Sequence, residues 1–100
     1  DPADDLKIFV NINKPSSGQV DVYYRVEKDS STPFEDIDWV LANPDKAVPY
    51  NEDPLAYSEG SYTIDDIGPF QAFSVKIVLT SSNSSTVPSV KDFRAIALSS

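Results

Sequence analysis

The sequence of 100 residues contains no cysteine, no histidine and no methionine. The absence of cysteine excludes disulfides, thiol catalysis and cysteine–zinc sites. The absence of histidine removes the commonest general base and the commonest metal-binding imidazole, so a serine nucleophile would lack its usual partner. We therefore expect no enzymatic activity and no cofactor. Because position 1 is not methionine, we also expect a processed product or a fragment of a longer polypeptide.

Basic residues are scarce as well. Eight Lys and Arg face sixteen Asp and Glu, which gives a formal net charge of −8 and a pI near 4.2. Such a surface repels polyanions, since nucleic-acid-binding proteins need a basic stripe, and it disfavours anionic membranes. No apolar run approaches the length of about 18 residues that a membrane span needs. We expect neither nucleic acid nor membrane insertion, and we interpret the acidity as keeping the protein soluble.

The sequence does contain short stretches in which apolar and polar residues alternate. Residues 6–13 place Leu6, Ile8, Val10 and Ile12 on one side, a period of two that indicates a half-buried strand. Residues 20–26 repeat the pattern, and the turn residues 14–18 between them predict a β-hairpin. Further strands are expected at 39–41, 57–64, 70–80 and 90–98, with Gly60 as a candidate β-bulge and one helical turn within 43–50.

Six short strands separated by turns indicate an all-β fold, which we predict to be an antiparallel β-sandwich, jelly-roll or immunoglobulin-like, in a single domain. We place the domain at residues 6–100 and interpret the polar residues 1–5 as a tail or the end of a linker. The predicted core consists of Leu6, Ile8, Val10, Val22, Tyr24, Val26, Trp39, Phe73, Val75, Ile77, Leu79, Ile96 and Leu98.

Aromatic residues are the first candidates for a binding site. Neighbouring strand residues point to opposite faces, so only one of Tyr23 and Tyr24 can be buried. Tyr24 shares its side with valines, which leaves Tyr23 facing outward beside Arg25, where the guanidinium can pack on the ring or meet another chain. Tyr50 and Tyr57 follow in the proline-rich loop region, where exposed rings can stack on sugars. The predicted binding residues are Tyr23, Arg25, Tyr50 and Tyr57.

Acidic residues gather at two places, 35–38 and 65–66. Ca²⁺ takes about six to eight oxygen ligands, and neighbouring carboxylates can supply some of them. Aspartates in loops also cap turns through their side-chain oxygens. The sequence leaves open whether an ion binds, and the candidate metal-site residues are Asp36, Asp38, Asp65 and Asp66.

Three segments together resemble a known family. They are VDVYYRV at 20–26, TPFEDIDWVL at 32–41, and the stretch 73–98, in which FSVKIVLTS leads through VPSVKDFR to the final Ala-Leu. The combination resembles a β-sandwich module of large virion structural proteins of tailed phages, especially contractile-tailed cyanophages. The resemblance implies a non-catalytic role in a tail, baseplate or fibre of an extracellular virion. The implied partners are other virion proteins or further copies of the chain.

The same paired-strand pattern is similar to jelly-roll modules that bind glycans. The alternative function is therefore a carbohydrate- or host-receptor-binding module, with a host surface glycan as the partner. The exposed aromatic and acidic residues of the loops at 29–38 and 43–57 would form its binding surface.

Overall fold

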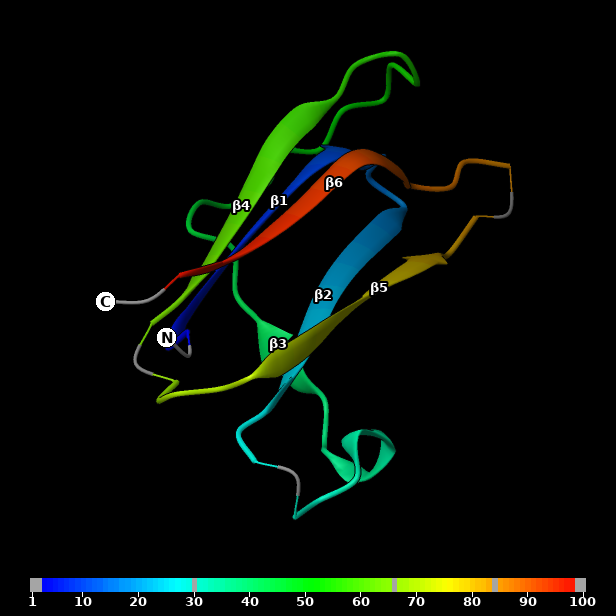
Figure 1. The fold of residues 1–100 in the computed structure, drawn as a ribbon. Helices are drawn as coiled ribbons and strands as arrows, with labels where there is room; N and C mark the ends of the chain where they lie inside the picture. Colours follow the sequence, from blue (N-terminus) through cyan, green and yellow to red (C-terminus); the bar gives the residue numbers. More distant parts are fainter. Residues whose placement is uncertain (1–2, 30, 66, 84, 99–100) are drawn as a thin grey trace.

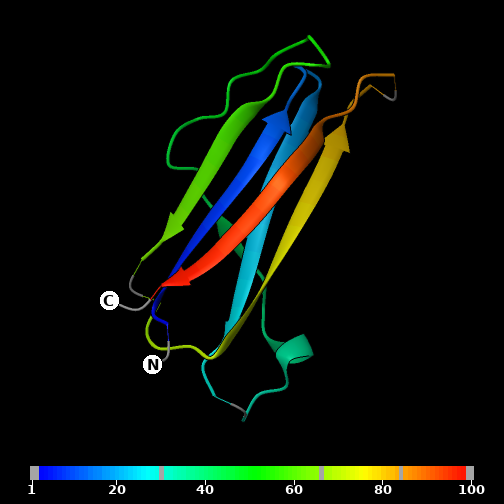
Figure 2. The same ribbon diagram turned by 45° about the horizontal axis from the view of Figure 1, so that its top comes forward.

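The structure is a computed structural model that describes residues 3–29, 31–65, 67–83 and 85–98. Its strands form two antiparallel sheets of three, ordered β4-β1-β6 and β3-β2-β5, which lie face to face (Figures 1 and 2). The predicted all-β sandwich is thereby confirmed. No helix in the described ranges is long and apolar enough to cross a membrane. The elements in chain order are β1 (Asp5–Asn13), β2 (Gly18–Glu27), the 3-10 helix η1 (Phe34–Asp36), β3 (Val40–Ala42), β4 (Ser58–Ile64), β5 (Ala72–Ser81) and β6 (Ser89–Leu98).

The predicted hairpin between β1 and β2 is wrong, because these strands belong to different sheets. β1 pairs with β4 and β6, whereas β2 pairs with β3 and β5. The turn after β1 therefore carries the chain from one layer to the other. Each strand has a continuous apolar side, and stacking the two sides face to face buries both, which side-by-side pairing in one hairpin would not do.

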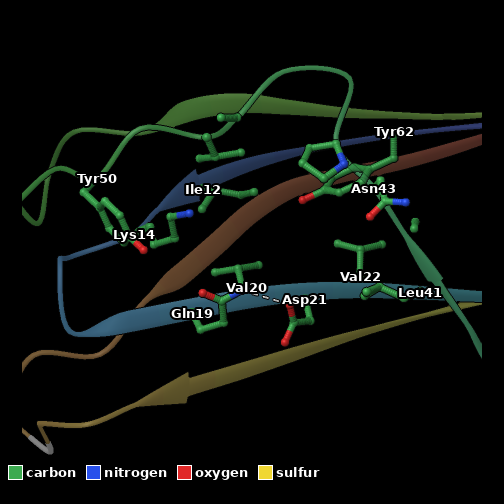
Figure 3. A pocket seen from close by; sticks show the side chains of 14 residues that line it. Ile12, Lys14, Gln19, Val20, Asp21, Val22, Leu41, Asn43, Tyr50 and Tyr62 are labelled. Carbon is green, nitrogen blue, oxygen red and sulfur yellow. Dashed lines mark hydrogen bonds between the residues drawn. The ribbon is translucent and has the colours of Figure 1, made fainter.

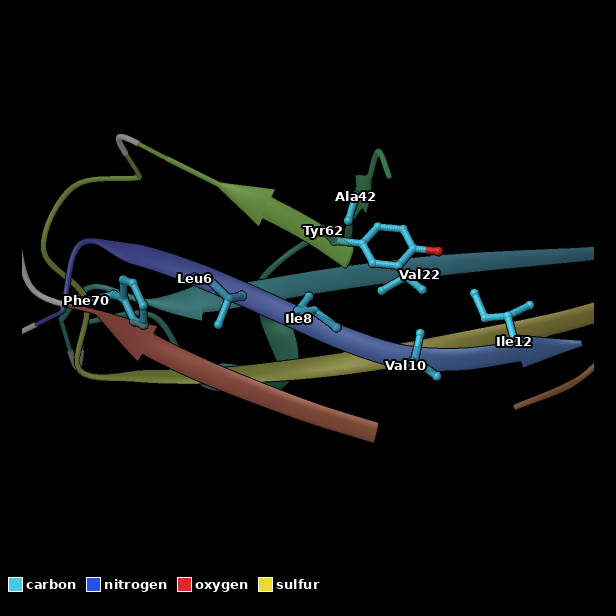
Figure 4. Packing of buried hydrophobic residues seen from close by; sticks show 8 residues of the cluster. All are labelled: Leu6, Ile8, Val10, Ile12, Val22, Ala42, Tyr62 and Phe70. Carbon is cyan, nitrogen blue, oxygen red and sulfur yellow. The ribbon is translucent and has the colours of Figure 1, made fainter. Parts of the chain in front are cut away.

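The hydrophobic core lies between the sheets and is built mainly on β1 (Figure 4). Leu6, Ile8 and Val10 are fully buried, and Ile12 is 2% exposed. β1 is central in its sheet, so both of its edges are paired and its inner side is covered by the opposite sheet. The other buried apolar residues come from β2, β3, β4 and the segment before β5, and they are Val22, Ala42, Tyr62 and Phe70.

Part of the predicted core is wrong. Ile96 is paired with Lys7 and Leu98 with Asp5, so both face outward, at 43% and 44% exposed. β6 carries apolar residues on both sides, and the inner side is taken by its alanines. Leu79 does face inward, because it is paired with Val20, but it lies near the end of β5 and stays exposed.

Gly60 is not a β-bulge, since the pairing of β4 with β1 runs without a shift through it. A side chain at this position would put its Cβ 2.9 Å from Cδ1 of Ile12, so the absence of a side chain at Gly60 leaves room for the end of the Ile12 side chain. The irregularity lies instead between β1 and β6, at Phe9 to Asn11, where Asp92 adopts a φ of 54°.

Two local predictions, a helical turn within 43–50 and a polar tail at residues 1–5, differ from the structure. The helical turn expected within 43–50 is absent, and that segment is a non-helical loop. The short helical turn of the chain is η1, which follows Pro33 in the acidic loop. At the start of the chain, Ala3 bridges to Phe70 and the Asp4 amide donates to the carbonyl of Leu98, so the described part of the predicted tail is tied to the sandwich.

Candidate functional site: an aromatic–cation face on the second sheet

The outer face of the sheet β3-β2-β5 carries a row of side chains that crosses all three strands. Tyr23 on β2 is paired with Leu41 on β3 and with Lys76 on β5. Directly paired residues of antiparallel strands share a face, and the neighbours of Tyr23, Val22 and Tyr24, point into the core. The row therefore faces away from the core, and Leu41 in it is 49% exposed.

Arg25, two residues further along β2, lies between two aromatic rings. Its guanidinium carbon is 5.0 Å from the ring centroid of Phe34 and 4.3 Å from that of Trp39. Lys76 covers a second pair of rings, with Nζ 5.1 Å from the centroid of Tyr23 and 4.6 Å from that of Trp39. We call this surface the aromatic–cation face, and it consists of Tyr23, Arg25, Phe34, Trp39, Leu41 and Lys76.

The two cations of this face have no acidic partner. Within the described ranges the single ion pair joins Arg94 to Glu59, at 3.4 Å, on the other sheet. Nε of Arg25 is buried without a hydrogen-bond partner, and its Nη1 reaches the carbonyl oxygen of Ile37 at 3.5 Å, a long contact. A chain of net charge −8 therefore presents a local surface with two unneutralised positive charges framed by aromatic rings.

Trp39 was predicted to be a core residue, and this is wrong. It is partly exposed and lies against Arg25 and Lys76 on the outer face. The outward prediction for Tyr23 and Arg25 agrees with their positions. Phe34 and Trp39 were not identified as neighbours of Arg25, because they come from the loop after β2. The aromatic and basic residues at 23–25 were the available signal for this face. They do not predict where the loop after β2 places Phe34 and Trp39.

Contact between cations and rings is general in this protein. Six of the eight basic side chains lie over an aromatic ring: Lys7, Lys14, Arg25, Lys76, Lys91 and Arg94. Because one face of these rings is already covered, a planar ligand such as a sugar would have to displace a cation or use the other side. The covered rings therefore favour a ligand that contacts cations and rings together over a planar ligand that stacks on a ring alone.

A cleft of about 440 Å³ lies between the sheets, below the loop at 43–50 (Figure 3). Its walls carry polar groups at the rim and apolar ones beneath. Tyr50, 56% exposed, contributes its ring at one end, where Nζ of Lys14 lies 4.4 Å from the ring centroid. Gln19 donates a hydrogen bond of 3.0 Å to the carboxylate of Asp21 on the same wall.

Tyr62 closes the inner wall of the cleft. Burial raises the pKa of the Tyr62 hydroxyl above its ordinary value of 10.0, and the negative charge of Asp21 adds to the rise. The hydroxyl therefore stays protonated and can act as a hydrogen-bond donor at neutral pH. The cleft thus has an aromatic ring at one end and apolar side chains beneath, and Gln19 and Asp21 lie at its rim.

The four predicted binding residues do not form one site. Tyr23 and Arg25 lie together on the aromatic–cation face, whereas Tyr50 lines the cleft. Tyr57 lies directly before β4 of the first sheet, where its hydroxyl is 3.0 Å from Oγ of Ser89 and its ring is covered by Lys91. Tyr50 and Tyr57 therefore belong to different surfaces.

Three of the four candidate metal residues lie in the part of the chain that the structure describes. Asp36 ends η1, Asp38 follows it, and Asp65 comes directly after β4, while Asp66 lies outside the described residues. No group of three or more acidic side chains that could hold a metal ion occurs in the part of the chain that the structure describes.

The fold and these surfaces define a small all-β sandwich with an aromatic–cation face on one sheet and a cleft between its layers. No model of a known protein family, no curated protein and no solved structure matches the chain.

Proposed function

We propose that the chain is a non-catalytic β-sandwich module that binds another protein through its aromatic–cation face. The observation that carries this proposal is the position of Arg25 between Phe34 and Trp39, without a carboxylate in reach among the described residues. Trp, Tyr and Arg are the residue types that dominate the binding energy of protein interfaces. Here all three lie on one sheet face, beside an exposed leucine.

The chemistry of the face indicates what it would bind. Two cations without acidic partners favour a surface that offers carboxylates. Leu41 and the Trp39 ring offer apolar area beside these charges. The proposed ligand is therefore a protein segment with acidic and apolar residues side by side.

A displayed library of random peptides, selected on the immobilised chain, tests this proposal. We expect the selected peptides to be rich in acidic and apolar residues. Their affinity should fall about tenfold or more with Trp39→Ala and with Arg25→Gln, because each change removes a central contact of the face. It should also weaken with rising salt, since charge attraction is screened.

The matched control is Tyr57→Ala, which removes an aromatic ring that also carries a cation but lies on the other sheet. It should leave peptide affinity unchanged. Circular dichroism of each variant checks that the strands are intact. Selected peptides that bind Trp39→Ala and Arg25→Gln as tightly as the unaltered chain would contradict the proposal.

The sequence resemblance also predicts that the chain is part of a phage virion, in its tail, baseplate or fibre. This stays a prediction. It is checked by mass spectrometry of purified particles after cross-linking through lysine. We expect a cross-link from Lys76 to another virion protein or to a second copy of the chain. Recovery of the parent polypeptide outside any particle would contradict the virion assignment and leave the binding proposal to its own test.

The cleft supports a second candidate function, the binding of a carbohydrate. Its volume of about 440 Å³ accommodates a sugar residue, and Tyr50, Gln19 and Asp21 supply a ring and hydroxyl-binding groups. In a glycan array, a positive signal should be lost with Tyr50→Ala and kept with Tyr57→Ala, because only Tyr50 lines the cleft. A blank array would contradict this function.

A further inference from the structure

The sandwich has four sheet edges, and three of them are protected. Asp45 covers the edge of β4: its amide donates to the carbonyl of Ser61, and its carboxylate accepts from the amide and hydroxyl of Thr63. β6 is interrupted by the irregularity at Asp92 and carries charged residues there. β3 has only three residues. Short strands, charges and irregularities are the usual ways in which proteins prevent edges from pairing.

The edge of β5 has none of these protections. The strand is ten residues long, contains neither proline nor glycine, and pairs only with β2 within the described part of the chain. Figure 2 shows it at the side of the sandwich away from β3 and β4, next to β6 of the other layer. Among the described residues, no loop makes a backbone hydrogen bond to its free side.

The pairing with β2 determines which backbone groups are free. The amide of Ser82 donates to the carbonyl of Ser17, just beyond the pair Gly18–Ser81. Hydrogen-bonded pairs alternate along an antiparallel ladder, so Lys76 and Val78 direct their amides and carbonyls toward β2. The alternate residues of the strand direct their amides and carbonyls toward the free edge. These residues are Phe73, Val75, Ile77 and Leu79.

The only charge on β5 does not guard this edge. The ammonium of Lys76 lies over the rings of Tyr23 and Trp39, which belong to β2 and the segment before β3. It therefore leans toward the interior of the sheet and away from the unpaired side. The edge presents free hydrogen-bonding groups and apolar side chains without a cation at its rim.

We propose that a second copy of this chain pairs with β5, so that the two β5 strands run antiparallel about a two-fold axis at Ile77. This register makes Ile77 a hydrogen-bonded pair with itself and places Val75 opposite Leu79 of the other copy. On the outer face it places Lys76 opposite Val78. The strand is self-complementary in this register because no two like charges face each other and apolar residues meet on the inner side.

The dimer joins the two sheets into one of six strands. The two-fold axis is perpendicular to the sheet, so both aromatic–cation faces lie on the same side of it. Each copy carries a net charge of −8, so repulsion between the copies opposes association. We therefore expect dimerisation to strengthen when salt is raised from low to physiological concentration, the opposite of the salt effect on the binding of acidic peptides.

Two substitutions at Val78 test the register, with sedimentation equilibrium as the measurement. Val78→Lys puts a cation opposite Lys76 of the other copy, and symmetry repeats the repulsion, so the dimer dissociation constant should rise about five- to tenfold. Val78→Glu should lower it by a similar factor. Within one chain Val78 is paired with Asp21, so Lys should stabilise the monomer and Glu should destabilise it. Fold stability and association therefore change in opposite directions.

Hydrogen exchange gives a readout that does not depend on variants. In the dimer the amides of Val75, Ile77 and Leu79 should exchange slowly and speed up on dilution, whereas those of Lys76 and Val78 should be slow throughout. A chain that is monomeric up to about millimolar concentration at physiological salt, with fast exchange at Ile77, would overturn the proposal. So would open-ended fibres, since the two-fold pairing closes after two copies. Trp39→Ala should leave the dimer intact, which separates this result from the peptide-binding test.

Discussion

β1 and β5 have similar alternating patterns of apolar and polar residues but differ in burial. Both alternate apolar and polar residues, yet the four inward side chains of β1 are at most 2% exposed, whereas none of the inward side chains of β5 is fully buried. β1 is central in its sheet and lies over β2. β5 is an edge strand with one unpaired side. The difference shows that burial follows from the position of a strand within the sandwich, and that the alternating pattern determines only which side turns inward.

The same comparison separates a closed side of the sandwich from an open one. The side built on β1 is closed: the Ile12 side chain fills the space beside Gly60, and Asp45 covers the outer edge of β4. The side built on β5 is open, with free backbone groups at its edge and the aromatic–cation face on its outer surface. The proposed peptide-binding face and the proposed dimer edge both lie on this open side.

The largest expected effect is the difference between truncating an isoleucine on β1 and one on β5. Ile8→Ala should reduce the free energy of unfolding by about 2–5 kcal/mol, since it leaves a cavity in a closed core. Ile77→Ala should cost about 1–2 kcal/mol, because its site is partly solvated. Urea unfolding of both variants measures the difference, and equal losses would show that the β5 side is as well packed as the β1 side.

The next effect tests the packing of the Ile12 side chain beside Gly60 of β4. Gly60→Val should destabilise the fold by about 1–3 kcal/mol, because the added side chain would overlap Ile12. The matched control is Thr80→Val on β5, which also introduces valine into a strand but at an exposed position. It should change the melting temperature little. A neutral Gly60→Val would mean that the Ile12 side chain can move aside without loss of stability.

The edge cover of β4 should be pH-dependent. The hydrogen bond from the Thr63 hydroxyl, together with those from Ser61 and the Thr63 amide, holds the pKa of Asp45 below its ordinary value of 3.8. A lowered pKa in the folded state means that this contribution is present above pH 3.8 and is lost as pH falls through the folded value. Asp45→Ala should cost about 1 kcal/mol at neutral pH and less in acid.

The control for this prediction is Asp29→Ala. Asp29 also has a lowered pKa, through its hydrogen bonds with Ser31, but it lies in a loop and covers no edge. Melting curves recorded from neutral to acidic pH measure both variants. A difference between Asp45→Ala and the unaltered chain that stays constant through this range would contradict the role of the carboxylate.

The smallest effect belongs to Tyr62 at alkaline pH. Its pKa is raised in the folded chain, so folding favours the protonated hydroxyl, and stability should fall as pH rises above 10.0. Tyr62→Phe removes the ionisable hydroxyl and should abolish its share of the loss of stability at alkaline pH. Ultraviolet titration of the tyrosines measures it, since one hydroxyl should ionise later than the exposed ones.

Much of the fold could be predicted from the sequence because alternation is a local property. Leu6, Ile8, Val22 and Ile77 all turn inward as predicted. Ile96 could not be assigned, because β6 has apolar residues on both sides and pairing with Lys7 decides between them. Within the site, the outward direction of Tyr23 and Arg25 followed from the valines beside them, whereas the partners of Arg25 did not.

The sequence by itself determined the class of the protein: six strand-forming segments, an acidic surface, and no side chains for thiol or histidine chemistry. These properties follow from composition and from a period of two, which need no knowledge of distant contacts. The tertiary structure alone decided that β1 and β2 lie in different layers, that Trp39 leaves the core to cover Arg25, and that β5 keeps a free edge. Each of these depends on which segments far apart in the chain meet, because burial and pairing are properties of the assembled layers and not of any one strand.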